Sequence, residues 1–179
     1  MAETKLGDNT VNTVGDLPEV GRPAPEFTVV KGDLSSLSLS DLAGQRVVLN
    51  IFPSIDTPTC AASVRHFNEV ASTLDNTTVL NVSMDLPFAQ TRFCGSEGLS
   101  EVVNASDFRD HTFGDAYGVR MVDGRLAGLF ARAVVVIDEQ GTVAHVELVP
   151  AIGQEPDYAA ALAALGMPPP SLRSVGPPG

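Results

Sequence analysis

Two cysteines are the residues of this 179-residue sequence whose placement most clearly indicates chemistry. Cys60 ends the stretch FPSIDTPTC, and the residues before it form a polar, proline-flanked turn rather than the apolar run expected around a packing cysteine. The pair Thr57-Pro58 is typical of a helix start, because threonine is favoured as the N-cap and proline is tolerated at the first helical position. Cys60 is therefore predicted to lie in the first turn of a helix.

A cysteine in that position is expected to be reactive. The unpaired backbone N–H groups and the positive end of the helix dipole favour the thiolate over the thiol, and the thiolate is the nucleophile. The alternative is a half-buried Cys60 that packs beside a capping threonine, since free cysteine is commonly buried. The residues of this stretch alone leave both interpretations open.

Composition and charge restrict the classes of function. The length fits one domain with its own core. The net charge of −11 disfavours nucleic acid as a partner, because the phosphate backbone would be repelled. We find no apolar run of membrane-spanning length and no signal-peptide pattern, which predicts no membrane partner and a cytoplasmic location. A framework of structural disulfides is then disfavoured, and the cysteines are predicted to serve either packing or redox chemistry.

Metal and cofactor chemistry find little support in the sequence. The three histidines, His66, His111 and His145, are far apart and form neither an HxxH nor an HExxH pattern. CxxC is also absent, so the sequence predicts no metal site and no cofactor.

The elements that must position the cysteines follow from hydrophobic patterning. Residues 47–52 form a continuous apolar run, which is typical of a strand buried on both faces of a sheet. Apolar residues at helical spacing predict a helix over 58–74, and residues 77–84 read as a second central strand. A helical segment from Pro87 carries Cys94, and the polar GSEG after Phe93 and this cysteine is expected to be loose.

The flanking segments complete the predicted fold. The expected elements are an N-terminal hairpin turning at residues 7–9, short strands at 27–30 and 34–39, a strand hairpin at 133–137 and 143–149, and a helix at 155–165. This order predicts an α/β, thioredoxin-like three-layer fold with a central mixed sheet and an N-terminal β-hairpin extension. One domain is expected to span 1–166, followed by a Pro-rich, disordered tail at 167–179.

Several stretches together carry a resemblance to a known family. Pro53, Thr57 and Cys60 form a PxxxTxxC pattern, which resembles the active-site pattern of the peroxiredoxins. The longer stretches NIFPSIDTPTCAASVRHFNEVA, SMDLPFAQTRFCGSEGL and ARAVVVIDEQG are similar to the thiol peroxidase branch, the atypical two-cysteine peroxiredoxins. PxxxTxxC alone is a weak signal, but with DLPFAQTRFC at the expected distance and EPDYAAALAAL near the end the resemblance covers most of the chain.

The resemblance implies a role for each of five residues. Cys60 matches the peroxidatic cysteine, which attacks a peroxide oxygen and becomes a sulfenic acid. Thr57 matches the threonine whose hydroxyl bonds to the thiolate and the peroxide, and Pro53 matches the proline that shields the pocket from water. Arg132 matches the arginine that holds the thiolate, although from the residue type alone it would be a surface ion-pair residue. Cys94 matches the resolving cysteine, whose alternative role is core packing, and the resemblance implies an intrachain Cys60–Cys94 disulfide.

The implied function is a thiol-dependent peroxidase acting on hydrogen peroxide and organic hydroperoxides. The implied partners are thioredoxin or a similar dithiol reductant and a second copy of the chain in a homodimer. A thioredoxin-like disulfide reductase is disfavoured, because Cys60 has no cysteine three residues away. The remaining alternative is a non-catalytic thioredoxin-fold binding or holdase module, and the intact set of Pro53, Thr57, Cys60 and Arg132 argues against it.

Overall fold

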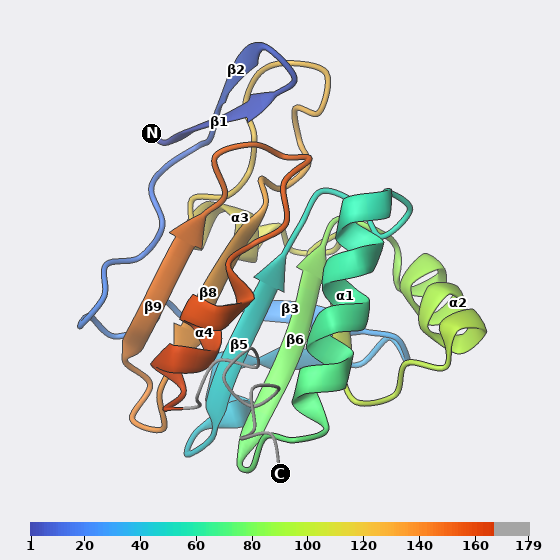
Figure 1. The fold of residues 1–179 in the computed structure, drawn as a ribbon, viewed down its shortest axis with the longest axis vertical. Helices are drawn as coiled ribbons and strands as arrows, with labels where there is room; N and C mark the ends of the chain where they lie inside the picture. The colour runs from blue at the N-terminus through green and yellow to red at the C-terminus, as the bar shows by residue number, and fades with distance from the viewer. Residues whose placement is uncertain (167–179) are drawn as a thin grey trace, which may run out of the picture.

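A seven-stranded mixed sheet forms the middle layer of the molecule (Figure 1). A computed structural model describes residues 1–166, so the predicted tail at 167–179 lies outside the described residues. The strand order is β4-β3-β7-β6-β5-β8-β9, with β5, β6 and β7 parallel to one another and the remaining pairs antiparallel. The strands are β3 (Thr28–Lys31), β4 (Ser36–Ser38), β5 (Arg46–Ile51), β6 (Thr77–Ser83), β7 (Val103–Ser106), β8 (Ala133–Ile137) and β9 (Val143–Leu148).

Helices cover both faces of the sheet. One apolar cluster contains residues of α1 (Pro58–Ala71), α2 (Pro87–Glu97) and α4 (Tyr158–Ala164), and in Figure 1 α1 and α4 lie in front of the strands. The other cluster contains residues of the short 3-10 helix η1 (Leu39–Leu42) and of α3 (Thr112–Ala116). These two helical layers and the sheet between them confirm the expected three-layer, thioredoxin-like arrangement.

Strand β5 shows why a continuous apolar run is needed at the centre. Successive side chains of a strand point to opposite faces. Val47 and Leu49 accordingly pack into the cluster with α3, whereas Val48 packs into the cluster with α1. All three are at most 1% exposed, so β5 is buried on both faces and fixes the position of the turn that follows it.

The N-terminal hairpin extension is also confirmed. Strands β1 (Glu3–Leu6) and β2 (Asn9–Asn12) form a separate two-stranded sheet, which projects at the top of Figure 1. Gly7 adopts a φ of +62° in the connecting turn, a conformation that glycine reaches without a steric penalty.

Three local differences separate the predicted from the observed elements. Strand β7 and helix α3 were not predicted, because VNAS and TFGDA are too short and too weakly patterned to stand out. The segment after Cys94 is not loose: α2 continues through Gly95 to Glu97 and ends at Gly98, whose φ of +68° is typical of a helix C-cap.

Of the helices in residues 1–166, none combines the length and the apolar character that crossing a membrane requires.

Candidate active site

Cys60 lies in the first turn of α1, as its sequence context predicts. The chain leaves β5 at Ile51, makes a turn through residues 52–57, and starts α1 at Pro58, with Thr57 as an extended N-cap residue. The Cys60 side chain is 0% exposed and packs in the apolar cluster that also contains Phe52. The sulfur is therefore enclosed by the turn, the helix and the end of the sheet.

Arg132 is brought against the Cys60 sulfur by the register of the sheet. Ile51 pairs with Ala133 across β5 and β8, so the preceding residue, Arg132, lies beside the end of β5. Its Nη2 donates a hydrogen bond to Cys60 Sγ at 3.1 Å, and its Nε donates to the carbonyl oxygen of Ile152 at 2.8 Å. The side chain is 1% exposed, so Arg132 is a core residue and not the surface ion-pair residue that its type alone would suggest.

Arg132 has no carboxylate partner within residues 1–166. The ion pairs in this part of the chain do not include it, and its Nη1 is buried with no hydrogen-bond acceptor. A buried cation without a counter-charge is strongly disfavoured. The Cys60 sulfur is the group in contact with the guanidinium that can carry a negative charge, and Nη1 remains free to donate to an incoming acceptor.

Thr57 and Pro53 occupy the turn before α1 in different ways. Pro53 is buried at the end of β5. Thr57 is exposed, and its hydroxyl donates to the carbonyl oxygen of Ser54 at 2.8 Å. Thr57 is thus the N-cap residue of α1, as predicted, but its hydroxyl bonds to Ser54 and makes no capping hydrogen bond with the helix N–H groups. Within residues 1–166, the Thr57 hydroxyl makes no hydrogen bond with Cys60. Arg132 does donate a hydrogen bond to the Cys60 sulfur.

Asp85 holds the turn before Cys60, a contact that the sequence analysis did not predict. Its carboxylate follows β6 and accepts hydrogen bonds from the Ile55 backbone N–H at 2.7 Å, the Ser54 hydroxyl at 2.8 Å and the Ser83 hydroxyl at 2.7 Å. β5 and β6 are parallel neighbours, so their carboxyl ends meet at one edge of the sheet. A carboxylate immediately after β6 could have been recognised on that ground as an anchor for the turn before Cys60.

Cys94 lies on α2, is 8% exposed, and is a free thiol, as is Cys60. Burial raises the pKa of the Cys94 thiol, and a hydrogen bond from Asn104 lowers that pKa in part. The Asn104 Nδ2 donates to Cys94 Sγ at 2.9 Å. The two cysteines belong to the same apolar cluster, so the fold brings both predicted sulfurs into one side of the molecule.

Exposed ion pairs tie α2 to the region around Cys60. Arg65 of α1 pairs with Glu97 of α2 at 2.7 Å, and Arg92 of α2 pairs with Asp56 of the turn at 3.3 Å. A hollow of about 360 Å³ lies between the start of α1 and α2, and Arg65, Phe93 and the turn residues line it. Exposed pairs of this kind contribute little, so these two add only weakly to the contacts that hold α2 in place.

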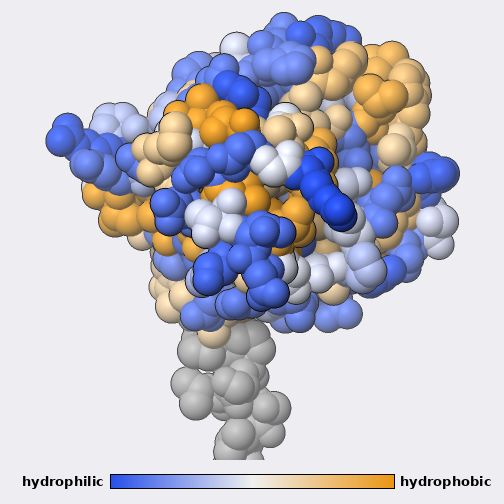
Figure 2. Space-filling view, turned by 90° about the horizontal axis from the view of Figure 1, so that it is seen from above, coloured by the Kyte–Doolittle hydropathy of each residue, from blue (hydrophilic) through white to orange (hydrophobic). Residues whose placement is uncertain are grey.

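The end of the molecule at which β5 and β6 finish is shown in Figure 2, seen from above relative to Figure 1. Apolar patches and hydrophilic side chains alternate over this face. Leu86 and Phe88, at the start of α2, are 51% and 65% exposed, so part of the apolar surface of the molecule lies next to Asp85 and the active-site turn.

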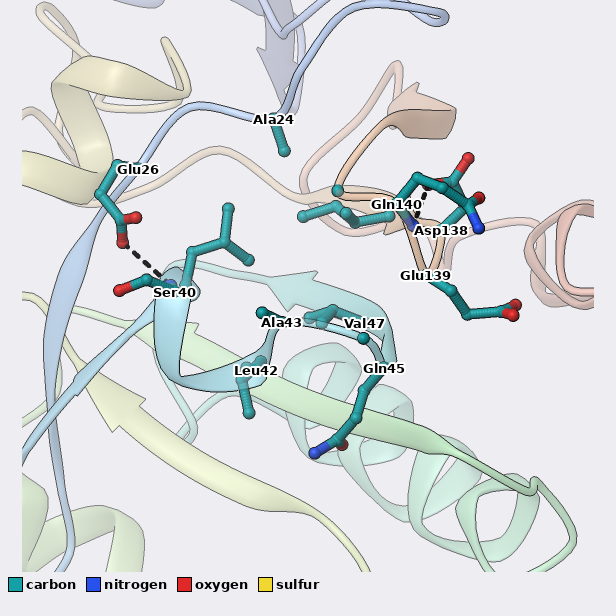
Figure 3. Close-up of a pocket in the computed structure, with 14 residues that line it drawn as sticks. Ala24, Glu26, Ser40, Leu42, Ala43, Gln45, Val47, Asp138, Glu139 and Gln140 are labelled. Atoms are coloured by element: carbon teal, nitrogen blue, oxygen red, sulfur yellow. Dashed lines mark hydrogen bonds between the residues drawn. The ribbon is translucent and has the colours of Figure 1, made fainter.

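A separate pocket of about 240 Å³ lies at the opposite end of β5, near the start of the strand (Figure 3). Glu26, Asp138 and Glu139 give it an acidic lining, and the Glu26 carboxylate accepts from the Ser40 backbone N–H. This pocket contains neither cysteine. Over residues 1–166, moreover, no three His, Cys, Asp or Glu side chains are grouped as metal ligands.

Comparison with known proteins places this geometry among thiol enzymes. A family model described as Redoxin matches residues 19–162. Proteins named "Thiol peroxidase" from Mycobacterium tuberculosis and Mycobacterium bovis are each 59% identical over 166 residues, which is 93% of this chain and 99% of each relative. A crystal structure of a peroxiredoxin-like protein from Aquifex aeolicus has 40% identity and a TM-score of 0.88, with 93% of this chain and 96% of that chain covered.

A more distant structure supports the fold alone. The thiol peroxidase from Chromobacterium violaceum has 20% identity and a TM-score of 0.85, and the alignment covers 92% of this chain and 95% of that one. The fold is therefore retained even where most residues differ.

Proposed function

The chain belongs to the redoxin family and is a thiol-dependent peroxidase, and within this activity we propose that Cys60 is the peroxidatic cysteine and Cys94 the resolving cysteine. A peroxide and a thioredoxin-type dithiol are the two substrates. Arg132 is proposed to hold the Cys60 thiolate and to polarise the peroxide, and Thr57 and Pro53 are proposed to complete the pocket.

The observation that carries the proposal is the buried contact between Arg132 and Cys60. A guanidinium in a low-dielectric interior needs a negative partner, and within residues 1–166 no carboxylate pairs with this one. A thiolate at 3.1 Å supplies that charge, and the guanidinium in turn stabilises the thiolate. The pair therefore supports Cys60 as the sulfur that attacks the peroxide.

The first chemical step follows from this pair. The Cys60 thiolate attacks one peroxide oxygen, the O–O bond breaks, and the sulfur becomes a sulfenic acid. The other oxygen leaves with the electron pair of the broken bond and takes up a proton to give water or an alcohol. The free N–H of Arg132 Nη1 is available to hydrogen-bond the oxygen on which this negative charge develops.

The second step requires α2 to move. The Cys94 thiolate attacks the sulfenic sulfur, an S–S bond forms, and the sulfenic hydroxyl leaves as water after protonation. A dithiol of the thioredoxin type then reduces the disulfide, and its own two thiols are oxidised to a disulfide. Both cysteines are buried on separate helices, so the first turn of α1 and the docking of α2 must loosen before the sulfurs meet.

Thr57 and Pro53 are assigned roles that involve the same opening. The Thr57 hydroxyl is engaged with Ser54 and must turn toward the sulfur to bind peroxide. Pro53 has no backbone N–H and is buried, which suits a residue that keeps water out of the pocket. A homodimer, activity on both hydrogen peroxide and organic hydroperoxides, and a cytoplasmic location stay predictions from the sequence.

The test uses the two cysteine variants as mutual controls. Pre-reduced wild type should consume peroxide continuously with thioredoxin present, and Cys60→Ser should consume none, because a serine hydroxyl is not ionised near neutral pH. Cys94→Ser should react with one equivalent and then stop, because its sulfenic acid cannot form the intrachain disulfide.

Peptide mapping after one equivalent of peroxide identifies the chemistry of each sulfur. A Cys60–Cys94 disulfide within one chain supports both assignments. Two free thiols, or a Cys60–Cys60 link between chains, would reject Cys94 as the resolving residue and leave Cys60 as the nucleophile. Near-normal turnover by Cys60→Ser would reject the peroxidatic assignment, and no peroxide loss by the wild type would favour the binding or holdase alternative.

A further inference from the structure

Three asparagine side chains form a ladder across the parallel strands beneath α1 and α2. Asn50 of β5 pairs in register with Asn81 of β6, and Asn81 pairs with Asn104 of β7. Asn50 and Asn81 are each 0% exposed. The ladder lies on the face of the sheet that carries both cysteines, because Asn50 contacts Ser63 of α1 and Asn104 contacts Cys94 of α2.

The hydrogen bonds of the ladder all run in one direction. The Asn50 Nδ2 donates to Asn81 Oδ1 at 2.9 Å, and the Asn81 Nδ2 donates to Asn104 Oδ1 at 3.3 Å. The Asn104 Nδ2 is the last donor, and its acceptor is Cys94 Sγ at 2.9 Å. The amide oxygens of Asn81 and Asn104 each accept from the amide before them, so the NH₂ group of Asn104 is turned toward the sulfur.

Packing alone does not account for three amides at these positions. Asparagine is depleted in strands, and a buried amide is unfavourable unless its polar atoms are paired. Pairing is incomplete here, because Asn50 Oδ1 is buried and accepts no hydrogen bond from the described residues. Valine at each position would remove that penalty, which suggests that the amides serve the sulfur at the end of the ladder.

The surroundings of Cys94 make Asn104 the group that favours its thiolate. A hollow of about 430 Å³ beside the sulfur is lined by side chains without charge, namely Thr91, Cys94, Gly95, Gly98, Leu99, Ser100 and Asn104. The two charged residues of α2, Arg92 and Glu97, are exposed and are paired with Asp56 and Arg65, which line the separate hollow between α1 and α2. Burial therefore opposes ionisation of the sulfur, and the Asn104 N–H is the contact that offsets it.

We propose that Asn104 is a positioning residue for Cys94, oriented by the Asn50–Asn81–Asn104 ladder so that its amide donates to the thiolate that resolves the sulfenic acid. This inference rests on the proposed role of Cys94. The amide acts as a neutral counterpart of Arg132: it stabilises the sulfur anion without adding charge. The expected consequence is a larger fraction of Cys94 thiolate at neutral pH when the sulfenic acid forms.

The direct test measures the ionisation of Cys94 by itself. The chain has two cysteines, so Cys60→Ser leaves Cys94 as the single thiol, whose titration can be followed by thiolate absorbance. Asn104→Leu should raise the pKa of Cys94 by about one unit, the scale of a hydrogen bond to a charged group. Asn104→Asp should raise it further, because the carboxylate offers no donor and repels the thiolate.

Asn68→Leu is the matched control for this titration. Asn68 accepts a hydrogen bond from the Glu101 backbone N–H and so ties α1 to the loop after α2 without contacting the sulfur. This variant should leave the pKa of Cys94 unchanged. An unchanged pKa in both Asn104 variants would overturn the proposal and reduce the ladder to a packing feature of the sheet.

The kinetic test uses the chain with both cysteines. Asn104→Leu should form the Cys60 sulfenic acid at the wild-type rate, close the disulfide about tenfold more slowly at neutral pH, and recover as the pH rises. Slow closure at every pH would indicate a structural role and count against the proposal. Failure to find the Cys60–Cys94 disulfide in the wild type would reject Cys94 as resolver but would leave the thiolate titration unaffected.

Discussion

The two cysteines lie in helices that the fold holds in opposite ways. Helix α1 buries five residues against the sheet, namely Cys60, Ala61, Ser63, Val64 and Phe67, and the turn before it is anchored by Asp85. Helix α2 buries three residues, namely Pro87, Gln90 and Cys94. Since local opening is easiest where few apolar contacts must be broken, α2 is expected to open more readily than α1.

The two sulfurs also differ in the charge of the groups that contact them. Cys60 contacts the buried cation of Arg132, whereas Cys94 contacts the neutral amide of Asn104 beside an open hollow. A buried cation stabilises a neighbouring anion more strongly than a neutral amide does, and for Cys94 the amide only partly offsets the effect of burial on the pKa. The comparison teaches that the fold encloses Cys60 beside a buried cation, whereas it holds Cys94 on a helix with fewer buried residues and beside a neutral amide.

The largest effect is expected from removing the cation on the Cys60 side. Arg132→Met keeps side-chain length but removes the charge and the Nη1 donor, so the second-order rate of Cys60 with peroxide should fall by about 100-fold to 1,000-fold. Stopped-flow measurement on the pre-reduced protein gives this rate. Arg120→Met, which removes an arginine paired with Asp115, is the control and should leave the rate unchanged.

Because Arg132 is buried, its removal also tests the fold, and a second variant separates the two effects. Arg132→Lys retains the charge without the planar donors and should keep an intermediate rate. A wild-type rate in a folded Arg132→Met protein would contradict the role of the cation. Neither cysteine would then depend on a charged donor for its reactivity.

A smaller effect is expected from releasing the turn before α1. Asp85→Ala removes the acceptor of three hydrogen bonds from Ser54, Ile55 and Ser83, so the turn should become mobile and the rate of Cys60 with peroxide should fall about tenfold. Asp56→Ala in the same turn removes only an exposed pair with Arg92 and serves as the control. Equal rates for the two variants would show that Asp85 does not position the turn.

Local patterns in the sequence were enough to predict the central elements of this comparison. The apolar run that forms β5 and the Thr57-Pro58 helix start each follow from a few consecutive residues, and together they place Cys60 in the first turn of α1. The three layers, the N-terminal hairpin and the hairpin of β8 and β9 were also predicted correctly, because each has a strong hydrophobic or turn signal.

The features that local patterns do not show depend on contacts between distant segments. Its residue type indicated a surface position for Arg132, and only the resemblance implied its contact with Cys60, because that contact arises from the pairing of β8 with β5. Asn50, Asn81 and Asn104 lie in separate segments, and each looks like a poor strand residue until the register aligns them. Strand β7 itself is defined by its neighbours β6 and β3 rather than by its own four residues.

The smallest effect is expected at the exposed tie between the helices. Glu97→Gln removes the ion pair with Arg65, so α2 should open more often and the disulfide should close about twofold faster once the sulfenic acid is present. The rate of Cys60 with peroxide should not change. Rapid acid quenching and peptide mapping give the rate of closure, and hydrogen exchange in α2 gives the frequency of opening.

Salt and pH provide an independent check of the same tie. High salt should speed closure in the wild type and have little effect in Glu97→Gln, because the pair is exposed and screened. The Arg65 hydrogen bond holds the pKa of Glu97 below its ordinary value, so the tie is intact at neutral pH and is lost only as the pH falls through that lowered pKa. If Glu97→Gln leaves both closure and exchange unchanged, then α2 is held by its buried residues and by Asn104. The contrast with α1 would then lie in the chemistry of the two sulfurs rather than in the mobility of their helices.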